Sequence, residues 1–317
     1  MATTTSITTT YAGESAGKYI AAALLSAPTI QKNLITVKPN VKYKEVVKTL
    51  ATNDIVKDAT CDFDATSTIT IAERVLQPEE YQVNLQLCKK DFHSDWNAIE
   101  MGYSAFDTLP KSFSDFLLAH VAEKVAAKTE TNIWTGATAN NGEFNGFATL
   151  IALDANLPAA QEVAGTTVTA SNVLTELRKV VDAIPARLYG VDGFGIYVAQ
   201  NVYKAYIQAL GGYGSSGLGA NGIGAQGSMW YSNQPLFIDG IPIYMVNGLA
   251  SNTAIATYKD NLWFGTGLLS DHQEVKLIDL AEIDGSMNIR VVMRFTAGVQ
   301  YGFAGDIVTY GITNAAN

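Results

Sequence analysis

The clearest hydrophobic pattern in this chain is a one-sided apolar stripe that recurs at every fourth residue. The residues that form it are Phe113, Leu117, Val121 and Val125. This spacing predicts a helix that buries one face. Ser112 and Asp115, directly after Pro110, match a capping box at its start. A helix from Ser112 to Thr135 would be roughly 36 Å long, about twice an average globular helix. We therefore expect a rigid spine.

Two stretches before this helix alternate apolar and polar residues, which predicts half-buried strands. The first runs from Thr60 to Ile71 and the second from Tyr81 to Leu87, with a turn from Ala72 to Glu80 between them. We expect these two strands to pair as a long hairpin. Because an isolated hairpin is marginal in water, its apolar face needs a partner outside itself, which another subunit would provide.

The two cysteines lie nearly symmetrically about the predicted turn. Aligning the apolar faces of the strands places Cys61 with Phe63, but it places Cys88 on the opposite face with Gln86. Only a bulge would bring the two sulfur atoms together. We therefore expect two free thiols.

The rest of the chain predicts a mixture of helices and strands. Residues 1–10 are rich in threonine and should form an extended arm, followed by a short amphipathic helix at Tyr19–Leu25. Beyond the spine we expect helices at Ser171–Ile184 and Asn201–Leu210, and strands at Phe147–Leu153, Phe194–Ala199, Ile238–Val246, Ala254–Tyr258, Leu262–Leu269, Glu274–Leu280, Met287–Phe295 and Gln300–Tyr310. The last of these strands should be broken at Gly302 and Gly305.

A glycine-rich stretch from Gly211 to Gly227 contains two matches to the G-x-G-x-x-G pattern, at 212–217 and 222–227. A dinucleotide site needs this pattern after a strand and at the start of a helix, so that free helix amides meet the pyrophosphate. Here the glycines follow a predicted helix, which argues against nucleotide binding. We expect a loop whose apolar residues become ordered on assembly; they are Tyr213, Leu218 and Ile223.

Composition adds a reason to expect assembly. The chain has 317 residues, of which 48% are hydrophobic and only 16% are charged. So few charges on a chain of this length suggest that much of its surface is buried against other chains. The net charge of −9 argues against a basic face that grips nucleic acid. No apolar run reaches the ~18 residues that a membrane span needs.

No set of residues in the sequence predicts catalysis, a cofactor or a metal. The three histidines, His93, His120 and His272, have no cysteine or carboxylate at ligand spacing. The sequence has no G-x-S-x-G elbow and no Walker loop. The neighbouring acids Glu79 and Glu80 and the neighbouring lysines Lys89 and Lys90 are best explained as solvated charges or ion pairs at strand ends.

The order of these parts is similar to that of one known family. An N-terminal arm, an alternating hairpin, a spine helix closed by Gly136, a helix–strand–helix domain with a glycine-rich loop and long returning strands follow one another. This layout resembles the major capsid proteins of tailed bacteriophages with the Hong Kong ninety-seven-type fold, over nearly the whole chain. The most typical stretches are Val173–Ile184, Phe194–Ala199 and the ending Ile289–Tyr310.

The resemblance implies an α+β capsid fold in five parts. They are an N-terminal arm at 1–50, an extended hairpin called the E-loop at 51–90, a P-domain with the spine helix at 91–168, an A-domain at 169–285, and strands at 286–317 that return through the P-domain into the A-domain. The E-loop would contact a neighbouring subunit through Phe63, Ile69, Ile71, Arg74, Val75, Gln77, Tyr81, Val83 and Leu85. The capsomer axis would be lined by Tyr213, Leu218 and Ile223.

The resemblance further implies a structural protein, without enzymatic activity or cofactor, that assembles with itself into pentamers and hexamers. These would form the icosahedral shell of a virion, put together in the bacterial host cytoplasm around double-stranded DNA that is contacted weakly. A portal and a decoration protein are further expected partners. Because the arm starts almost at Met1, we also expect a separate scaffolding protein.

Three other functions fit the sequence less well. An encapsulin-like shell has the same fold but encloses protein cargo instead of a genome. An enzyme of another class lacks a recognisable site in this sequence. A carbohydrate-binding β-protein would leave the long predicted helix unexplained.

Overall fold

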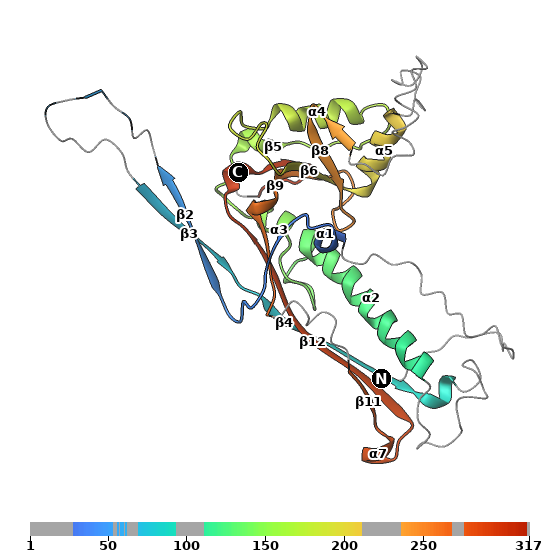
Figure 1. The fold of residues 1–317 in the computed structure, drawn as a ribbon. Helices are drawn as coiled ribbons and strands as arrows, with labels where there is room; N and C mark the ends of the chain where they lie inside the picture. The colour runs from blue at the N-terminus through green and yellow to red at the C-terminus, as the bar shows by residue number, and fades with distance from the viewer. Residues whose placement is uncertain are drawn as a thin grey trace.

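The computed structural model describes residues 28–52, 56, 58–59, 61, 69–92, 111–210, 236–267 and 276–315. They build an elongated body from which a two-stranded hairpin projects (Figure 1). The helices are α1 (Pro28–Gln31), α2 (Lys111–Thr135), α3 (Phe147–Ala152), α4 (Val173–Asp182), α5 (Gln200–Leu210) and α7 (Ala281–Asp284). The strands are β1 (Thr36–Lys38), β2 (Glu45–Thr52), β3 (Ile69–Leu76), β4 (Glu79–Cys88), β5 (Glu162–Val163), β6 (Phe194–Val198), β7 (Leu236–Ile238), β8 (Ile241–Met245), β9 (Ala254–Tyr258), β10 (Leu262–Gly265), β11 (Lys276–Asp279), β12 (Asn288–Tyr301) and β13 (Val308–Tyr310).

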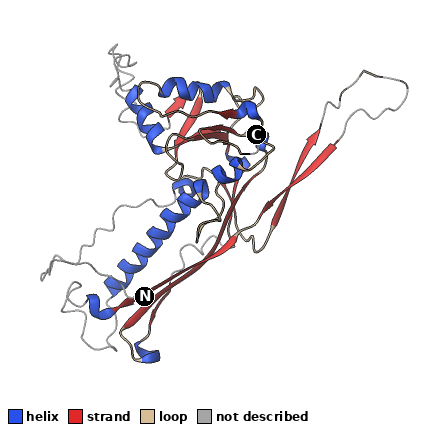
Figure 2. Ribbon diagram, turned by 180° about the vertical axis from the view of Figure 1, so that it is seen from behind, coloured by secondary structure: helices blue, strands red, loops and turns tan. Residues whose placement is uncertain are grey.

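Two sheets organise the body, and the C-terminal segment enters both. The upper sheet in Figure 1 has six strands in the order β5-β13-β9-β6-β8-β7, and α4 and α5 lie over it. The lower sheet has five strands, in which β12 pairs with β10, β11 and β4, and β1 lies beside β10. After β12, a short 3-10 turn at Ala304–Asp306 leads directly into β13 of the upper sheet. Figure 2 shows the same arrangement from behind.

The predicted spine helix is confirmed as α2, and Gly136 follows its last residue. A β-carbon at Gly136 would lie only 2.4 Å from the carbonyl oxygen of Phe144, so only glycine fits there. The apolar stripe packs on the returning strands, as expected: Leu117 and Val121 form a buried cluster with Leu87 of β4 and with Ile289 and Val291 of β12. The side chains of Phe113 and of the predicted capping box lie outside the described part of the structure.

The C-terminal end of α2 packs instead into the larger hydrophobic core, which includes residues of α3 and of the upper sheet. Trp134 is fully buried, with its ring centroid 5.4 Å from that of Phe147 and 5.3 Å from that of Tyr197. The Trp134 indole Nε1 donates a hydrogen bond to Thr29 Oγ1, and that hydroxyl donates to the buried carboxylate of Glu130 at 2.6 Å. These contacts fasten α1 to the end of the spine.

The predicted hairpin pairing is wrong. The strand β3 pairs with β2, from Ile69 opposite Thr52 to Leu76 opposite Glu45, whereas β4 pairs with β12 over ten positions. The physical reason is that alternation fixes which residues share a face but not which strand lies alongside. The apolar residues of β4 and β12 lie on one shared face of the sheet, and this face packs against α2. The segment 53–68 lies largely outside the described residues.

Some of the other expected helices and strands are confirmed and others are wrong. The predictions for α4, α5, β6 and β9 are confirmed. The strand expected at Phe147–Leu153 is the helix α3, because a short apolar run does not distinguish a strand from a buried helical turn. The break expected at Gly302 and Gly305 in the last strand is confirmed, because the chain is divided there between β12 and β13. The strand expected at Ile238–Val246 is divided by the turn before β8. The helix expected at Tyr19–Leu25 and the glycine-rich stretch lie outside the described residues.

The parity argument about the cysteines loses its basis, because their segments do not pair with each other. Cys61 is exposed, Cys88 at the end of β4 is half-buried, and both are free thiols.

We predict that Val121→Asp destabilises the subunit by about 4 kcal/mol, because it places a carboxylate against Ile289 and Val291. Ala119→Asp is the control, since Ala119 is exposed on the same helix. By helix propensity alone it should cost more than Val121→Asp, at most about 0.7 kcal/mol, so a larger loss for Val121→Asp reports the lost packing. Urea unfolding of the purified subunit measures both. Equal losses for the two variants would contradict the packing described for α2.

Candidate assembly surface

The hairpin formed by β2 and β3 has two chemically different faces. Residues directly opposite each other in an antiparallel pair share a face, and successive residues alternate between faces. One face contains the pairs Val46–Val75, Leu50–Ile71 and Thr52–Ile69, and between them Lys48 lies opposite Glu73. The other face contains Glu45–Leu76, Val47–Arg74 and Ala51–Thr70.

The first face carries the apolar strip, which we define as Val46, Leu50, Ile69, Ile71 and Val75. Their side chains are 48%, 58%, 63%, 61% and 40% exposed. Soluble monomers seldom present a contiguous apolar surface on a projecting element unless it binds something. Lys48 and Glu73 in the middle of the strip bring opposite charges together across the strands. The strip is therefore an apolar surface with one small polar interruption.

The second face attaches the hairpin to the body at its root. Leu76 is fully buried and lies over Gly265 of β10, where a β-carbon would be 2.9 Å from Leu76 Cδ2. The backbone then passes close to β12, because a β-carbon at Gly298 would lie 2.9 Å from the carbonyl oxygen of Gln77. The approach to backbone atoms at Gly298 requires glycine, whereas a β-carbon at Gly265 would displace the side chain of Leu76.

A buried polar cluster at the root joins the hairpin to three other segments. We call it the root cluster: Arg74 of β3, Asp154 after α3, and Tyr301 of β12. Arg74 Nη2 donates to Asp154 Oδ2 at 2.5 Å, and the Tyr301 hydroxyl donates to the same oxygen at 2.6 Å. The Arg74 guanidinium also lies over the Tyr301 ring, with Cζ 5.0 Å from its centroid.

Every acceptor position of Asp154 is used. Its Oδ1 accepts hydrogen bonds from the Asn156 amide at 3.0 Å and from Asn156 Nδ2 at 2.8 Å. Its backbone carbonyl accepts one from Asn314 Nδ2 at 2.8 Å, which attaches the C-terminal segment. Burial alone would raise the pKa of Asp154, but the donors Tyr301, Asn156 and Arg74 together hold that pKa below its usual range.

Two further contacts fix the root. Gln300 Nε2 donates to the carbonyl oxygen of Val75 at 3.1 Å. On the other strand, Lys38 Nζ lies 2.6 Å from Glu45 Oε1 and also sits over the Trp263 ring, 4.9 Å from its centroid. Both strands of the hairpin are thus tied to the lower sheet.

The structure distributes the predicted E-loop residues over three places. Ile69, Ile71 and Val75 lie on the apolar strip, whereas Arg74 and Gln77 lie at the root. Tyr81, Val83 and Leu85 lie on β4 beside β12. The Tyr81 ring contacts the rings of Phe144 and Phe295 in tilted arrangements. Val83 packs against the buried cluster that contains Leu117 and Val121, and Leu85 is 37% exposed. Phe63 and the predicted axis residues Tyr213, Leu218 and Ile223 lie outside the described residues.

Sequence reasoning missed the contribution of β2 to the strip. Val46 and Leu50 take part in two of its three cross-strand pairs, with Val75 and Ile71 as their partners. The segment does contain apolar residues at even positions 46 and 50, but Val47 between them obscures the alternation.

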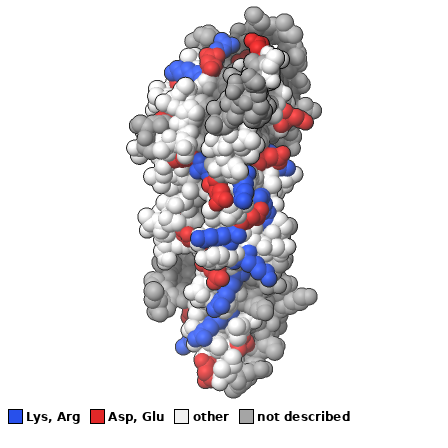
Figure 3. All heavy atoms as spheres, turned by 90° about the vertical axis from the view of Figure 1, so that its left-hand side faces the viewer, with Lys and Arg blue, Asp and Glu red and all other residues white. Residues whose placement is uncertain are grey.

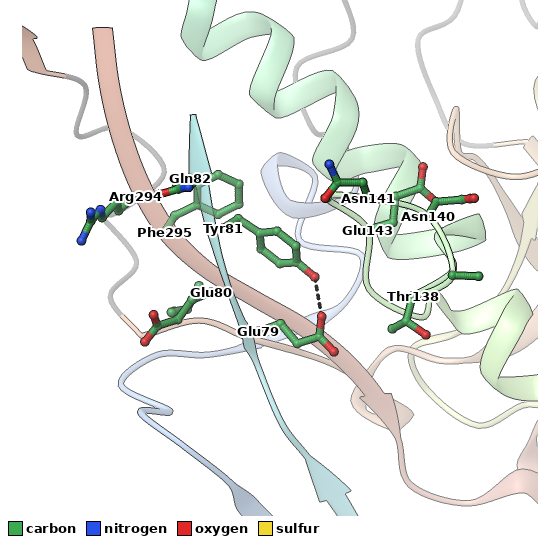
Figure 4. Close-up of a pocket in the computed structure, with 13 residues that line it drawn as sticks. Glu79, Glu80, Tyr81, Gln82, Thr138, Asn140, Asn141, Glu143, Arg294 and Phe295 are labelled. Carbon is green, nitrogen blue, oxygen red and sulfur yellow. Dashed lines mark hydrogen bonds between the residues drawn. The ribbon is translucent and has the colours of Figure 1, made fainter. Parts of the chain in front are cut away.

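A pocket of about 1060 Å³ lies between the β4–β12 ribbon and the loop after α2 (Figure 4). The Tyr81 hydroxyl points toward this loop and donates to Glu79 Oε2 at 3.0 Å. Burial and the Glu79 carboxylate raise the pKa of Tyr81, so its hydroxyl remains protonated. On the opposite wall, hydrogen bonds from Lys128, Asn140 and the Ala137 amide lower the pKa of Glu143 to about 2. The Glu143 carboxylate thus ties the loop after α2 to Lys128 and to itself.

The described residues contain no group of three or more histidine, cysteine or acidic side chains able to hold a metal ion. Among the helices that the structure describes, none is long and apolar enough to cross a membrane. On the face shown in Figure 3, Lys and Arg side chains form a short row among Asp and Glu rather than a broad basic surface.

Comparisons with known proteins identify the fold. No protein-family model and no curated protein matches the chain. Solved structures match along nearly its whole length. The capsid of a native GTA particle is 14% identical with a TM-score of 0.61, covering 91% of this chain and 91% of that chain. A structure from Mycobacterium phage Adephagia is 16% identical with a TM-score of 0.57, covering 92% and 91%. The capsid of Myoviridae phage XM1 is 11% identical with a TM-score of 0.55, covering 89% and 90%.

The chain therefore has the fold of phage capsid proteins, of the Hong Kong ninety-seven type that its sequence resembles. The α+β fold class expected from the sequence is confirmed.

We predict that the contribution of Asp154 to stability depends on pH. Because its pKa is lower in the folded chain than in the unfolded one, this contribution is fully present above the unfolded pKa of about 3.9 and is lost progressively as pH falls from there through the lower folded pKa. Asp154→Asn should cost about 2 kcal/mol at neutral pH and progressively less as pH falls below about 3.9. Urea unfolding at several pH values measures the difference. The exposed Asp192→Asn is the control, and a pH-independent loss for Asp154→Asn would contradict the prediction.

Proposed function

We propose that this chain is a major capsid protein, which assembles with copies of itself into the pentamers and hexamers of an icosahedral shell around the double-stranded DNA of a tailed phage. The observation that carries the proposal is the apolar strip on a projecting hairpin, in a chain with a phage-capsid fold. The strip lacks an apolar partner among the described residues of its own chain, and a neighbouring copy supplies one.

The geometry of the hairpin supports assembly between identical subunits. The hairpin projects from one side of the body, so a contact between it and the body of a second copy joins two different surfaces (Figure 1). Such heterologous contacts produce closed rings when their rotation closes, which is the arrangement of pentamers and hexamers. The low share of charged residues fits a chain whose surface is largely covered by neighbours.

Charge supports a weakly held genome. A net charge of −9 keeps a shell from binding DNA tightly through its phosphates, so the DNA can be packed into it. We propose a portal, a scaffolding protein and a decoration protein as further partners, the virion capsid as the final location and the bacterial host cytoplasm as the place of assembly.

The family's parts are assigned to this chain with one change of boundary. We propose that the E-loop comprises β2, β3 and the segment between them, and that β4 belongs with α2, β11 and β12 to the P-domain. The upper sheet with α4 and α5 corresponds to the A-domain, and the chain before β1 to the N-terminal arm.

Electron microscopy of the particles tests this function. We expect large shells that contain DNA when the protein is isolated from its phage, and empty shells or capsomers when it is expressed alone. Small shells filled with protein cargo would favour an encapsulin-like compartment instead. A stable monomer at high concentration would contradict both.

We predict that Ile71→Asp gives a folded subunit that does not assemble, because it places a charge in the apolar strip. Thr70→Asp is the matched control, since Thr70 is the exposed neighbour of Ile71 on the opposite face of the same strand. Circular dichroism measures folding and sedimentation velocity measures assembly. If Ile71→Asp assembles as well as Thr70→Asp, the strip is not a subunit interface.

A further inference from the structure

The β2–β3 hairpin is attached to the body at its root, so the contacts there set its orientation. The eight residues of β3 span about 26 Å, so a rotation of about 10° at the root moves the far end by about 4–5 Å. Such a displacement is enough to bring a strip of side chains out of register with a partner surface. Whatever fixes the angle at the root therefore decides where the strip is presented.

Apolar packing at the root does not fix this angle alone. Leu76 is fully buried over Gly265, but it is the last residue of β3, and one apolar side chain at the end of a strand does not by itself define an angle. The bond from Gln300 to the Val75 carbonyl is exposed, as is much of the Lys38–Glu45 ion pair. Exposed polar pairs contribute little to holding a geometry.

The root cluster, unlike the other contacts, is largely buried and restrains a side chain of β3 in two directions. The side chains of Arg74 and Asp154 are 24% and 7% exposed, so water competes weakly for their bond. Arg74 is held in two directions, by the carboxylate at its edge and by the Tyr301 ring against its face. Asp154 is itself held by Asn156, Tyr301 and Asn314, so it cannot follow a displaced guanidinium.

We propose that Asp154 is a positioning residue, which acts through Arg74 to hold the hairpin at one angle to the body. The groups that face its carboxylate are Arg74, Tyr301 and Asn156, and the arginine is the sole cation that the structure places in contact with it among the described residues. Asp154 and Arg74 do not need to touch a neighbouring subunit for this role. The role in assembly rests on the proposed function, whereas the role in holding the angle does not.

Distance measurements between two spin labels test the proposal on the unassembled subunit. In a background in which Cys61 and Cys88 are serine, one label is placed at Thr70→Cys on β3 and the other at Arg178→Cys on α4. Both positions are exposed and lie in regular elements. Electron–electron double resonance then reports the distribution of distances between hairpin and body.

We expect a narrow distribution for this background and a broadened or shifted one after Arg74→Met, which keeps an unbranched apolar stem but removes the charge and the hydrogen-bond donors. Arg187→Met is the matched control, because it breaks the arginine–aspartate pair with Asp306, which lies outside the root. An unchanged distribution for Arg74→Met would overturn the proposal.

Two further variants distinguish an effect on the hairpin angle from loss of folding and from loss of assembly. Tyr301→Phe keeps the ring under Arg74 and removes one hydrogen bond to Asp154, so it should broaden the distribution even if Arg74→Met does not fold. Ile71→Asp should leave the distribution narrow although it prevents assembly, because the strip is not part of the root. If Ile71→Asp assembles normally while Arg74→Met broadens the distribution, the apolar strip is not the subunit interface, whereas the positioning role stands. If the unsubstituted chain remains a monomer at high concentration while Arg74→Met broadens the distribution, the proposed function fails and the positioning role stands.

Discussion

The pairing of β12 with its neighbours is the interaction on which the rest of the structure depends. This strand of fourteen residues carries β4 along ten positions, and its other edge carries β11 at one end and β10 at the other. Its inward residues provide the surface on which α2 packs, and Tyr301 near its end joins the root cluster. Through β13 the same segment enters the upper sheet. A change in β12 therefore affects the spine, the hairpin root and the upper sheet together.

The hairpin divides its two faces between two tasks. At its root, one face is committed to the chain's own body through Leu76 and Arg74, while the other presents an apolar strip to the surroundings. Because the side-chain period of a strand is two, a shift of one residue would exchange these faces. The root contacts thus fix both the register and the orientation of the surface that we assign to assembly.

Sequence patterns predicted the elements whose cause is local. The spine, α4 and α5 follow from apolar residues repeated at helical spacing, and β6 follows from a short buried run. Strand partners were not predictable in this way, because the alternation in β4 is satisfied equally by β3 or by β12. The root cluster was beyond reach for a related reason. Arg74 and Asp154 are 80 positions apart, and no local pattern connects a charged residue in a strand with an acid after a distant helix.

In the assembled particle, we propose, the apolar strip is an interface between subunits. A cryo-electron microscopy reconstruction of the particle tests it most directly. We predict that Leu50, Ile69 and Ile71 are covered by the body of a neighbouring copy, with Arg74 still bound to Asp154 of its own chain. A shell in which the strip faces solvent, or in which Arg74 pairs across the interface, would contradict the account.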